Sequence, residues 1–224
     1  MDFEVLYRPT YSLLEIRLNL NEAVQAEAGA MVYMSPTIEI QTQMKGGFLS
    51  AISRSMLGGE SLFINTFKAT GGKGELGLAP AYSGDIIHHK LLGENLYVQS
   101  GSYIASSPEI EIETRWGGAK SFFSREGLFL LKMKGTGDVF LSSFGAIHVK
   151  ELKNERFTID TGHMVAFTEG LDYSVKRVGE LKSTLLSGEG LVAEFRGTGK
   201  LYIQTRNVES FANWLFPFLP MRER

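Results

Sequence analysis

Histidines and glutamates are the residues of this chain whose chemistry matters most, because they bind metals and transfer protons near neutral pH. The four histidines are His88, His89, His148 and His163. A metal site needs two or three ligands at matched spacing, whereas His88 and His89 are adjacent and would point to opposite faces of a strand. We therefore expect structural or surface histidines and no bound metal.

Three glutamates recur in similar surroundings, at Glu60, Glu126 and Glu189. Paired carboxylates carry out acid–base chemistry when they are buried close together. A catalytic residue is usually unique, whereas a residue that recurs with a structural segment is copied with the scaffold. We favour a scaffold role, in which each carboxylate accepts backbone N–H bonds at a turn, over a carboxylate-based enzyme.

One glycine-rich segment, Gly72–Gly77, fits the glycine spacing of dinucleotide-binding loops. Such a loop must open a helix whose N-terminus holds the pyrophosphate, and Pro80 and Gly84 exclude a helix directly after it. We therefore predict a hairpin turn here and no nucleotide cofactor.

The remaining polar candidates predict turns and solvated surface. Ser124 and Ser187 lack the Gly-x-Ser-x-Gly context of an activated nucleophile, so we interpret both as turn residues. Glu109, Glu111 and Glu113 share one strand face and could hold a cation, but a solvated face is the simpler interpretation. From the sequence we assign no catalytic, cofactor-binding or metal-binding residue.

Composition narrows the class of protein further. The 224 residues include no cysteine, which excludes disulfides, thiolate metal sites and thiol nucleophiles, and favours a cytoplasmic setting. The 23 basic and 25 acidic residues nearly cancel, so we do not expect broad attraction to nucleic acid. No signal peptide is recognisable, and no apolar stretch approaches the about 18 residues of a membrane span. We expect a soluble protein.

Glycine-separated segments of alternating polarity dominate the chain. There are 25 glycines and 6 prolines, and the glycines separate short segments such as Ile38–Gln41, Ile110–Glu113 and Leu201–Gln204. Alternation of period two is typical of strands, and glycine supplies the positive φ of tight turns. We predict a single all-β domain.

The chain resembles itself three times, which indicates an internal repeat. Gly29–Ile40, Gly101–Ile112 and, more weakly, Gly162–Phe167 form one recurring block, and a second block containing the recurring glutamates follows each of them. We predict three divergent β-units in a pseudo-threefold arrangement around a shared core, with approximate bounds at 1–92, 93–154 and 155–206.

Variable inserts separate the two blocks of each unit. The longest, Lys45–Leu57, carries Phe48, Ile52 and Met56 at helical spacing. We expect this face to pack on another subunit, with Trp116, Phe122 and Phe123 of the second insert nearby. The alternatives are docking on its own domain and contact with a membrane surface. A short helix at 207–216 should close the chain, capped by Asn207, stopped by Pro217 and carrying Phe211, Trp214, Leu215 and Phe218.

These blocks resemble a family named for a yeast protein that affects mitochondrial inheritance (AIM24-like). The matching stretches include Gly29–Ile40, Asp160–Phe167 and Gln204–Asn207. The resemblance implies a fold like that of the tryptophan RNA-binding attenuation protein (TRAP-like), described as antiparallel β-sandwich or double-stranded β-helix units. It implies no catalytic residue and does not carry over RNA binding.

The leading functional hypothesis is a non-enzymatic scaffold or protein-interaction protein that acts as a homo-oligomer. The alternative is a small-molecule or nucleic-acid binding module, by analogy of fold alone. A scaffold should expose apolar patches, whereas a binding module should have a pocket with convergent polar groups.

Overall fold

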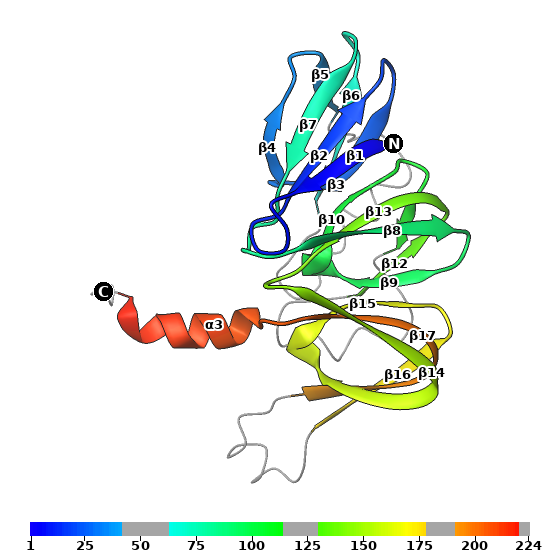
Figure 1. Cartoon of the computed structure of the whole chain (residues 1–224), viewed down its shortest axis with the longest axis vertical. Coiled ribbons are helices and arrows are strands. Elements are labelled where there is room, and N and C mark those ends of the chain that lie inside the picture. Colours follow the sequence, from blue (N-terminus) through cyan, green and yellow to red (C-terminus); the bar gives the residue numbers. More distant parts are fainter. Residues whose placement is uncertain (42–62, 114–129, 178–190, 220–224) are drawn as a thin grey trace.

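The computed structural model describes residues 1–41, 63–113, 130–177 and 191–219, and in these ranges the chain is mostly β-strand (Figure 1). The α-helix of these residues is α3 (Val208–Leu215), close to the C-terminus. The prediction of an all-β fold with a short C-terminal helix is therefore confirmed.

The strands form three successive groups, which follow β1 (Asp2–Leu6). The first group comprises β2 (Leu13–Leu18), β3 (Ala23–Glu27), β4 (Met31–Met34), β5 (Ile38–Gln41), β6 (Ile64–Ala69) and β7 (Gly74–Leu78). The second comprises β8 (Ile86–Leu92), β9 (Leu96–Gln99), β10 (Tyr103–Ser106), β11 (Glu111–Glu113), β12 (Leu130–Lys134) and β13 (Thr136–Ser142). The third comprises β14 (Ile147–Asp160), β15 (Met164–Thr168), β16 (Leu171–Arg177) and β17 (Leu191–Gln204).

The same antiparallel pairings occur in each group. In the first, β2 and β4 flank β7, while β3 and β5 flank β6. In the second, β8 and β10 flank β13, while β9 and β11 flank β12. In the third group, the long strands β14 and β17 each occupy the positions of two strands of the other groups. β14 and β15 flank the second half of β17, and β14 and β16 flank its first half.

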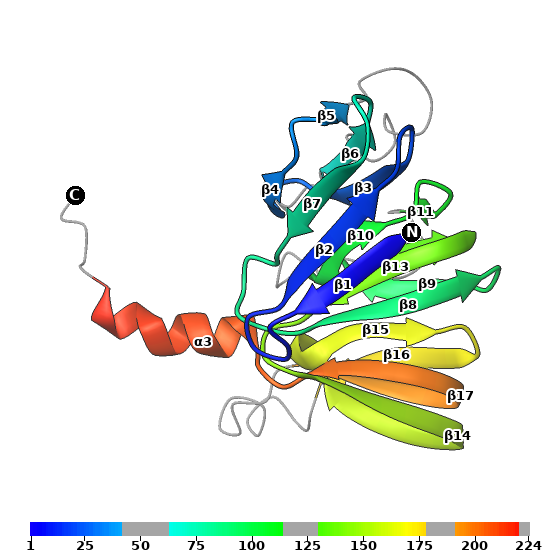
Figure 2. The same cartoon turned by 45° about the horizontal axis from the view of Figure 1, so that its top comes forward.

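Strands from consecutive groups join into continuous sheets. One sheet has the order β5-β6-β3-β10-β13-β8, with three strands from the first group followed by three from the second. The next has the order β11-β12-β9-β15-β17-β14, with three from the second group followed by three from the third. The strands consequently follow one another down the molecule, from β5 and β6 at one end to β14 at the other (Figure 2).

A bulge and a hydrogen bond recur on one strand of each group, namely β4, β10 and β15. The bulges lie between Met31 and Tyr33 in β4, and at the corresponding places of β10 and β15. Shortly beyond each bulge, a side-chain hydroxyl accepts a hydrogen bond of 2.9 Å from a backbone N–H of the neighbouring strand. The acceptors are Ser35, Ser107 and Thr168, and the donors are Glu75, Asp138 and Lys200.

Glycines with positive φ lie where the chain passes from one sheet to the next, at Gly72 and Gly135, and at Gly197 within the long strand β17. Gly72, Gly135 and Gly197 have φ values of +134°, +127° and +127°, a region that residues with a Cβ rarely adopt. The prediction of a hairpin at Gly72–Gly77 is wrong, because β6 pairs with β3 and β5 whereas β7 pairs with β2 and β4. The segment turns a corner between two sheets and then continues as β7.

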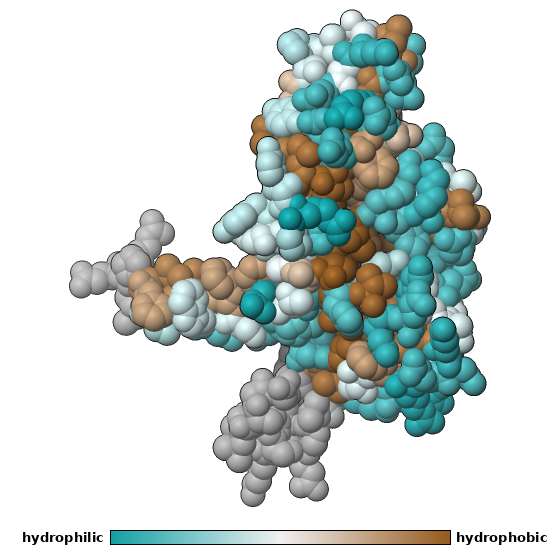
Figure 3. Space-filling view, in the orientation of Figure 1, coloured by the Kyte–Doolittle hydropathy of each residue, from teal (hydrophilic) through white to brown (hydrophobic). Residues whose placement is uncertain are grey.

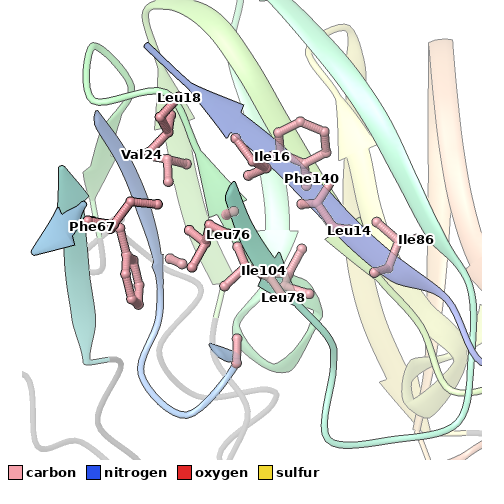
Figure 4. Packing of buried hydrophobic residues seen from close by; sticks show 14 of the residues in the cluster. Leu14, Ile16, Leu18, Val24, Phe67, Leu76, Leu78, Ile86, Ile104 and Phe140 are labelled. Carbon is pink, nitrogen blue, oxygen red and sulfur yellow. The ribbon is translucent and has the colours of Figure 1, made fainter. Parts of the chain in front are cut away.

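The buried apolar residues form three clusters instead of the single shared core that we expected. The first cluster contains Leu14, Ile16 and Leu76 of the first group together with Phe140 of the second (Figure 4). The second cluster similarly combines residues of the second group with Val165 of the third. Because these clusters cross from group to group, apolar burial joins the groups to one another.

Candidate interaction surface

The C-terminal helix leaves the β-body at a capped start. Asn207 follows the end of β17, and its side-chain oxygen accepts hydrogen bonds from the backbone N–H groups of Glu209 at 2.8 Å and Ser210 at 3.2 Å. This satisfies two of the amide groups that a helix leaves free at its N-terminus. The helix ends at Leu215, one residue before the predicted end, and Pro217 lies in a short 3₁₀ turn, η4 (Phe216–Phe218).

A row of aromatic side chains runs from the β-body out along this helix. We call it the aromatic row, and its ring centroids are 5.4–5.9 Å apart between successive members. In order from the body, the row comprises Tyr82, Phe144, Phe211, Trp214 and Phe218. Aromatic pairs at this separation attract one another beyond simple apolar contact. The row therefore fixes one face of α3 relative to the body.

The outer part of the aromatic row lies in solvent. No residue of α3 or η4 is buried, and Trp214 and Phe218 are 62% and 71% exposed. Phe216 and Leu219 are exposed beside them. The helix projects from the β-body, and Figure 3 shows hydrophobic residues along it, interspersed with polar ones. Several adjacent large apolar side chains in water mark a contact surface.

A glutamine holds the base of the helix to the β-body. Gln204 is 5% exposed; its side-chain oxygen accepts a hydrogen bond from the backbone N–H of Phe144, and its amide donates to the carbonyl of Gly162. His163 contacts the Gln204 carbonyl through Nδ1 at 2.7 Å. A cavity of about 710 Å³ lies beside this base, and Arg206 is among the residues that line it. The helix thus starts from a well-anchored position.

A second cavity, of about 820 Å³, lies near the junction of the first two groups. Its lining is mixed, with polar and large apolar side chains from both groups. The polar and charged members include Glu22, Gln25, Lys68, Ser107 and Glu109. Convergent polar groups in a cavity are the feature expected of a small-molecule site.

The histidines occupy separate places in the structure. His88 and His89 lie on β8 and point apart: His88 Nε2 contacts Asp138 Oδ1 at 2.9 Å, and His89 Nδ1 contacts the Tyr202 hydroxyl at 2.8 Å. Burial lowers the pKa of His89. His148 is exposed on β14, and His163 lies at the helix base. Within the described ranges, no three His, Asp or Glu side chains are grouped so that they could hold a metal ion.

Two buried aspartates accept hydrogen bonds from basic side chains. Asp138 accepts hydrogen bonds of 2.9 Å from Lys90 and His88; burial alone would raise its pKa, but these bonds outweigh that effect and the pKa is lowered. Asp85 accepts a two-point hydrogen bond from Arg8 and one from Ser12. The hydrogen bond to Asp85 is the main cause that raises the pKa of Arg8. Charge-assisted hydrogen bonds of this kind are shorter and stronger than those between neutral groups.

The other sequence candidates divide between solvated surface and segments outside the described residues. Glu109, Glu111 and Glu113 are exposed, and the isoleucines between them are buried. The remaining candidates lie outside the described residues. They are the recurring glutamates Glu60, Glu126 and Glu189, the serines Ser124 and Ser187, the insert with Phe48, Ile52 and Met56, and the aromatic residues Trp116, Phe122 and Phe123. Their proposed roles therefore stay predictions.

The chain is similar in sequence and in structure to known proteins. A model of the family described as mitochondrial biogenesis AIM24 matches residues 3–206. The chain belongs to the AIM24 family. An uncharacterized protein of Streptococcus pyogenes serotype M6 is 34% identical over 229 residues, which cover 98% of this chain and 92% of that protein. The crystal structure of a Streptococcus pyogenes protein is similar with a TM-score of 0.79 and 32% identity, and the match covers 97% of this chain and 99% of that one.

Two features of this AIM24-family chain escaped the sequence analysis. Tyr82 and Phe144 complete the aromatic row, although only its helical members were singled out. The hydroxyls of Ser35, Ser107 and Thr168 form the recurring hydrogen bond. A signal for the first two hydroxyls was present, because Ser-Pro occurs in both of the first two blocks. No spacing rule pointed to Phe144, which reaches Phe211 only through the fold.

Proposed function

We propose that the protein is a non-enzymatic, cytoplasmic scaffold that acts through protein–protein contact as a homo-oligomer. The observation that carries this proposal is the exposed outer part of the aromatic row on α3 and η4. Burying one large apolar side chain stabilises a contact by about 1.5–3 kcal/mol. Trp214, Phe216 and Phe218 together therefore supply the apolar centre of a protein interface.

The architecture suits such a role. We infer that the three strand groups are copies of one TRAP-like β-unit, arranged with pseudo-threefold symmetry. The recurring pairings, bulges, hydroxyl contacts and corner glycines support this inference. A chain of repeated units stacked through their neighbours is rigid and presents surfaces at fixed positions, as repeat proteins do.

The test is the mass of the protein in solution. Light scattering of the unmodified chain should give a multiple of the chain mass, and the double variant Trp214→Ser/Phe218→Ser should give a smaller species with an unchanged β-sheet circular dichroism spectrum. Glu209→Gln, on the same helix, is the matched control and should leave the mass unaltered. A chain that is monomeric at all concentrations would overturn the proposal.

The fluorescence of Trp214 can show whether α3 contacts a membrane instead of a protein. If Trp214 fluorescence shifts to the blue on addition of anionic phospholipid vesicles, and the Trp214→Phe variant lacks this shift, the helix binds a lipid surface instead of a protein. The insert residues Phe48, Ile52 and Met56 remain a further proposed contact between subunits.

A second candidate function is a small-molecule binding module, which the polar cavity of about 820 Å³ favours. Native mass spectrometry of protein purified without added ligand tests it directly. A bound small molecule that is lost in the Lys68→Ala/Glu109→Ala variant would establish this alternative. A mass equal to that of the chain or its multiples would argue against it.

A further inference from the structure

The two ends of the row of sheets are half-sheets that complement each other. Each complete sheet consists of two half-sheets of three strands from consecutive groups. We call the half from the earlier group, such as β5-β6-β3, the leading half, and the half from the next group, such as β10-β13-β8, the trailing half. At one end of the molecule, β4-β7-β2 is a trailing half with no leading half beside it. At the other end, β16 and the adjoining halves of β17 and β14 form a leading half with no trailing half. Each end lacks what the other end has.

The edges that would meet are unpaired in the described part of the chain. β4 pairs with β7 alone, and residues 155–160 of β14 pair with β17 alone. The corresponding strands at the two internal junctions each have a partner on both sides, because β10 pairs with β13 and β3, and β15 pairs with β17 and β9.

Exposure follows this difference in pairing. Met31, Val32 and Met34 of β4 are 40%, 57% and 37% exposed. All residues at the corresponding positions of the two internal strands are at most 1% exposed. These residues are Tyr103, Ile104 and Ser106 of β10, and Met164, Val165 and Phe167 of β15. β4 thus has the apolar composition of an interior strand at a place where its side chains meet water.

The edge of β4 lacks the protection that proteins usually give to an open strand. Exposed edge strands carry charges or proline that prevent pairing with another chain. β4 consists of Met31–Met34 and contains neither. On the facing edge of β14, Ile159 is buried and Thr158 is exposed, and the charged residues Glu155 and Arg156 are exposed at the far end of this segment. At the corresponding positions of β9, Val98 is buried and Tyr97 is half-buried.

We propose that β4 of one chain pairs with residues 155–160 of β14 in a second copy, head to tail. The contact completes a sheet with the order β16-β17-β14-β4-β7-β2-β1, and its first six strands repeat the arrangement formed twice within the chain. It rests on the proposed homo-oligomer and names a second contact between copies, separate from the aromatic row on α3 and η4. In the internal junctions Ser106 faces Gln25, and Phe167 faces Tyr97. The same register places Met34 opposite Thr158 of the partner subunit.

Such a contact joins two different surfaces, so each added copy presents the same free edge again. A contact of this kind gives a closed ring where the rotation between copies closes, and an open fibre where it does not. The assembly should therefore contain more than two chains, unless the ring already closes with two copies.

Cysteine cross-linking tests the register, because the chain contains no natural cysteine. Oxidation of Met34→Cys/Thr158→Cys should produce a ladder of covalent multimers on a denaturing gel without reductant. Mixing Met34→Cys with Thr158→Cys should give a covalent dimer and nothing larger. A cross-link in Met34→Cys alone would indicate a symmetric contact between two β4 strands and would overturn the proposal.

Two controls make a negative result decisive. Gln25→Cys/Ser106→Cys carries the same pair within one chain and should form an intramolecular disulfide, which verifies the strand geometry. Met34→Cys/Glu155→Cys moves one cysteine three residues along β14 and should give no ladder. If the internal control forms its disulfide and Met34→Cys/Thr158→Cys stays monomeric, the head-to-tail contact is wrong.

The scaffold proposal can fail separately. The ladder should persist when Trp214→Ser/Phe218→Ser is added, because these changes leave both sheet edges intact. An oligomer in light scattering without a ladder would overturn the head-to-tail contact and leave the homo-oligomer standing. Met34→Lys, a change at an exposed position, should lower the assembly mass at least two-fold while the fold is kept.

Discussion

Met34 and Ser106 hold the same position in two successive strand groups, one residue before a hydroxyl that bonds the neighbouring strand, yet Met34 is 37% exposed and Ser106 is completely buried. The difference has one visible cause. β3 lies beside Ser106, and no described strand lies beside Met34 on that side. The two residues hold the same position in their strand groups, and the presence or absence of a neighbouring strand determines whether the side chain is buried.

The recurring hydroxyl contact should contribute to stability. Ser107→Ala removes the acceptor of the Asp138 N–H, which lies in a buried region, and we expect a loss of about 1–3 kcal/mol in the free energy of unfolding. Ser107→Thr keeps a hydroxyl and should lose less. Urea unfolding followed by circular dichroism measures both, and equal losses would show that the hydroxyl is not the cause.

The corner glycine of the second group should resist substitution. Gly135 has a φ of +127°, and a Cβ there would meet the Glu109 carbonyl oxygen at 2.6 Å. Gly135→Ala should therefore cost about 1–3 kcal/mol through backbone strain, with the steric contact in addition. Gly93→Ala is the control, because Gly93 also has a positive φ but has no atom near its missing Cβ. If the two variants have the same midpoint temperature of thermal unfolding, the contact with Glu109 is unimportant.

The cap of α3 should be separable from the β-fold. Asn207→Ala removes the acceptor for two N–H groups and should destabilise the helix by about 1 kcal/mol. Asn207→Asp keeps the acceptor and should preserve the helix. The NMR chemical shifts of Glu209 and Ser210 report the change, while those of β2 should not move. Loss of signal throughout the β-body would show instead that the cap supports the whole fold.

Acid should weaken the protein through His89. Burial lowers the pKa of His89 below its ordinary value of 6.5, so below pH 6.5 the unfolded chain binds a proton that the folded chain does not. The free energy of unfolding should therefore fall as the pH drops from 6.5 to the pKa of folded His89, and stay constant above pH 6.5 as far as this group is concerned. His89→Gln should flatten that part of the profile. A profile identical to that of the unmodified chain would exclude His89 as the cause.

The sequence was sufficient for features that depend on neighbouring residues. Period-two alternation located strands such as Ile38–Gln41, and Asn207 with Pro217 located the helix. It could not assign partners, because alternation gives the face of a residue and not the strand beside it. That is why a hairpin was predicted after β6, where the chain changes sheet.

The candidate surface was only half predictable for the same reason. Phe211 and Trp214 stand out at helical spacing, and the sequence alone places them together. Phe144 and Tyr82 are separated from them by more than sixty residues, and only the closure of β14 on β17 brings Phe144 to the helix base.

The length of β17 has a mechanical consequence. α3 follows β17 directly, and β17 is bonded to β14 along nearly its whole length. A pull on the helix would act along the axis of β17, and the hydrogen bonds to β14 would bear the load together in shear, since they lie across the direction of pull. Two short strands with a corner between them would instead open one bond after another. The helix is thus tethered to a long strand pair whose hydrogen bonds share the load.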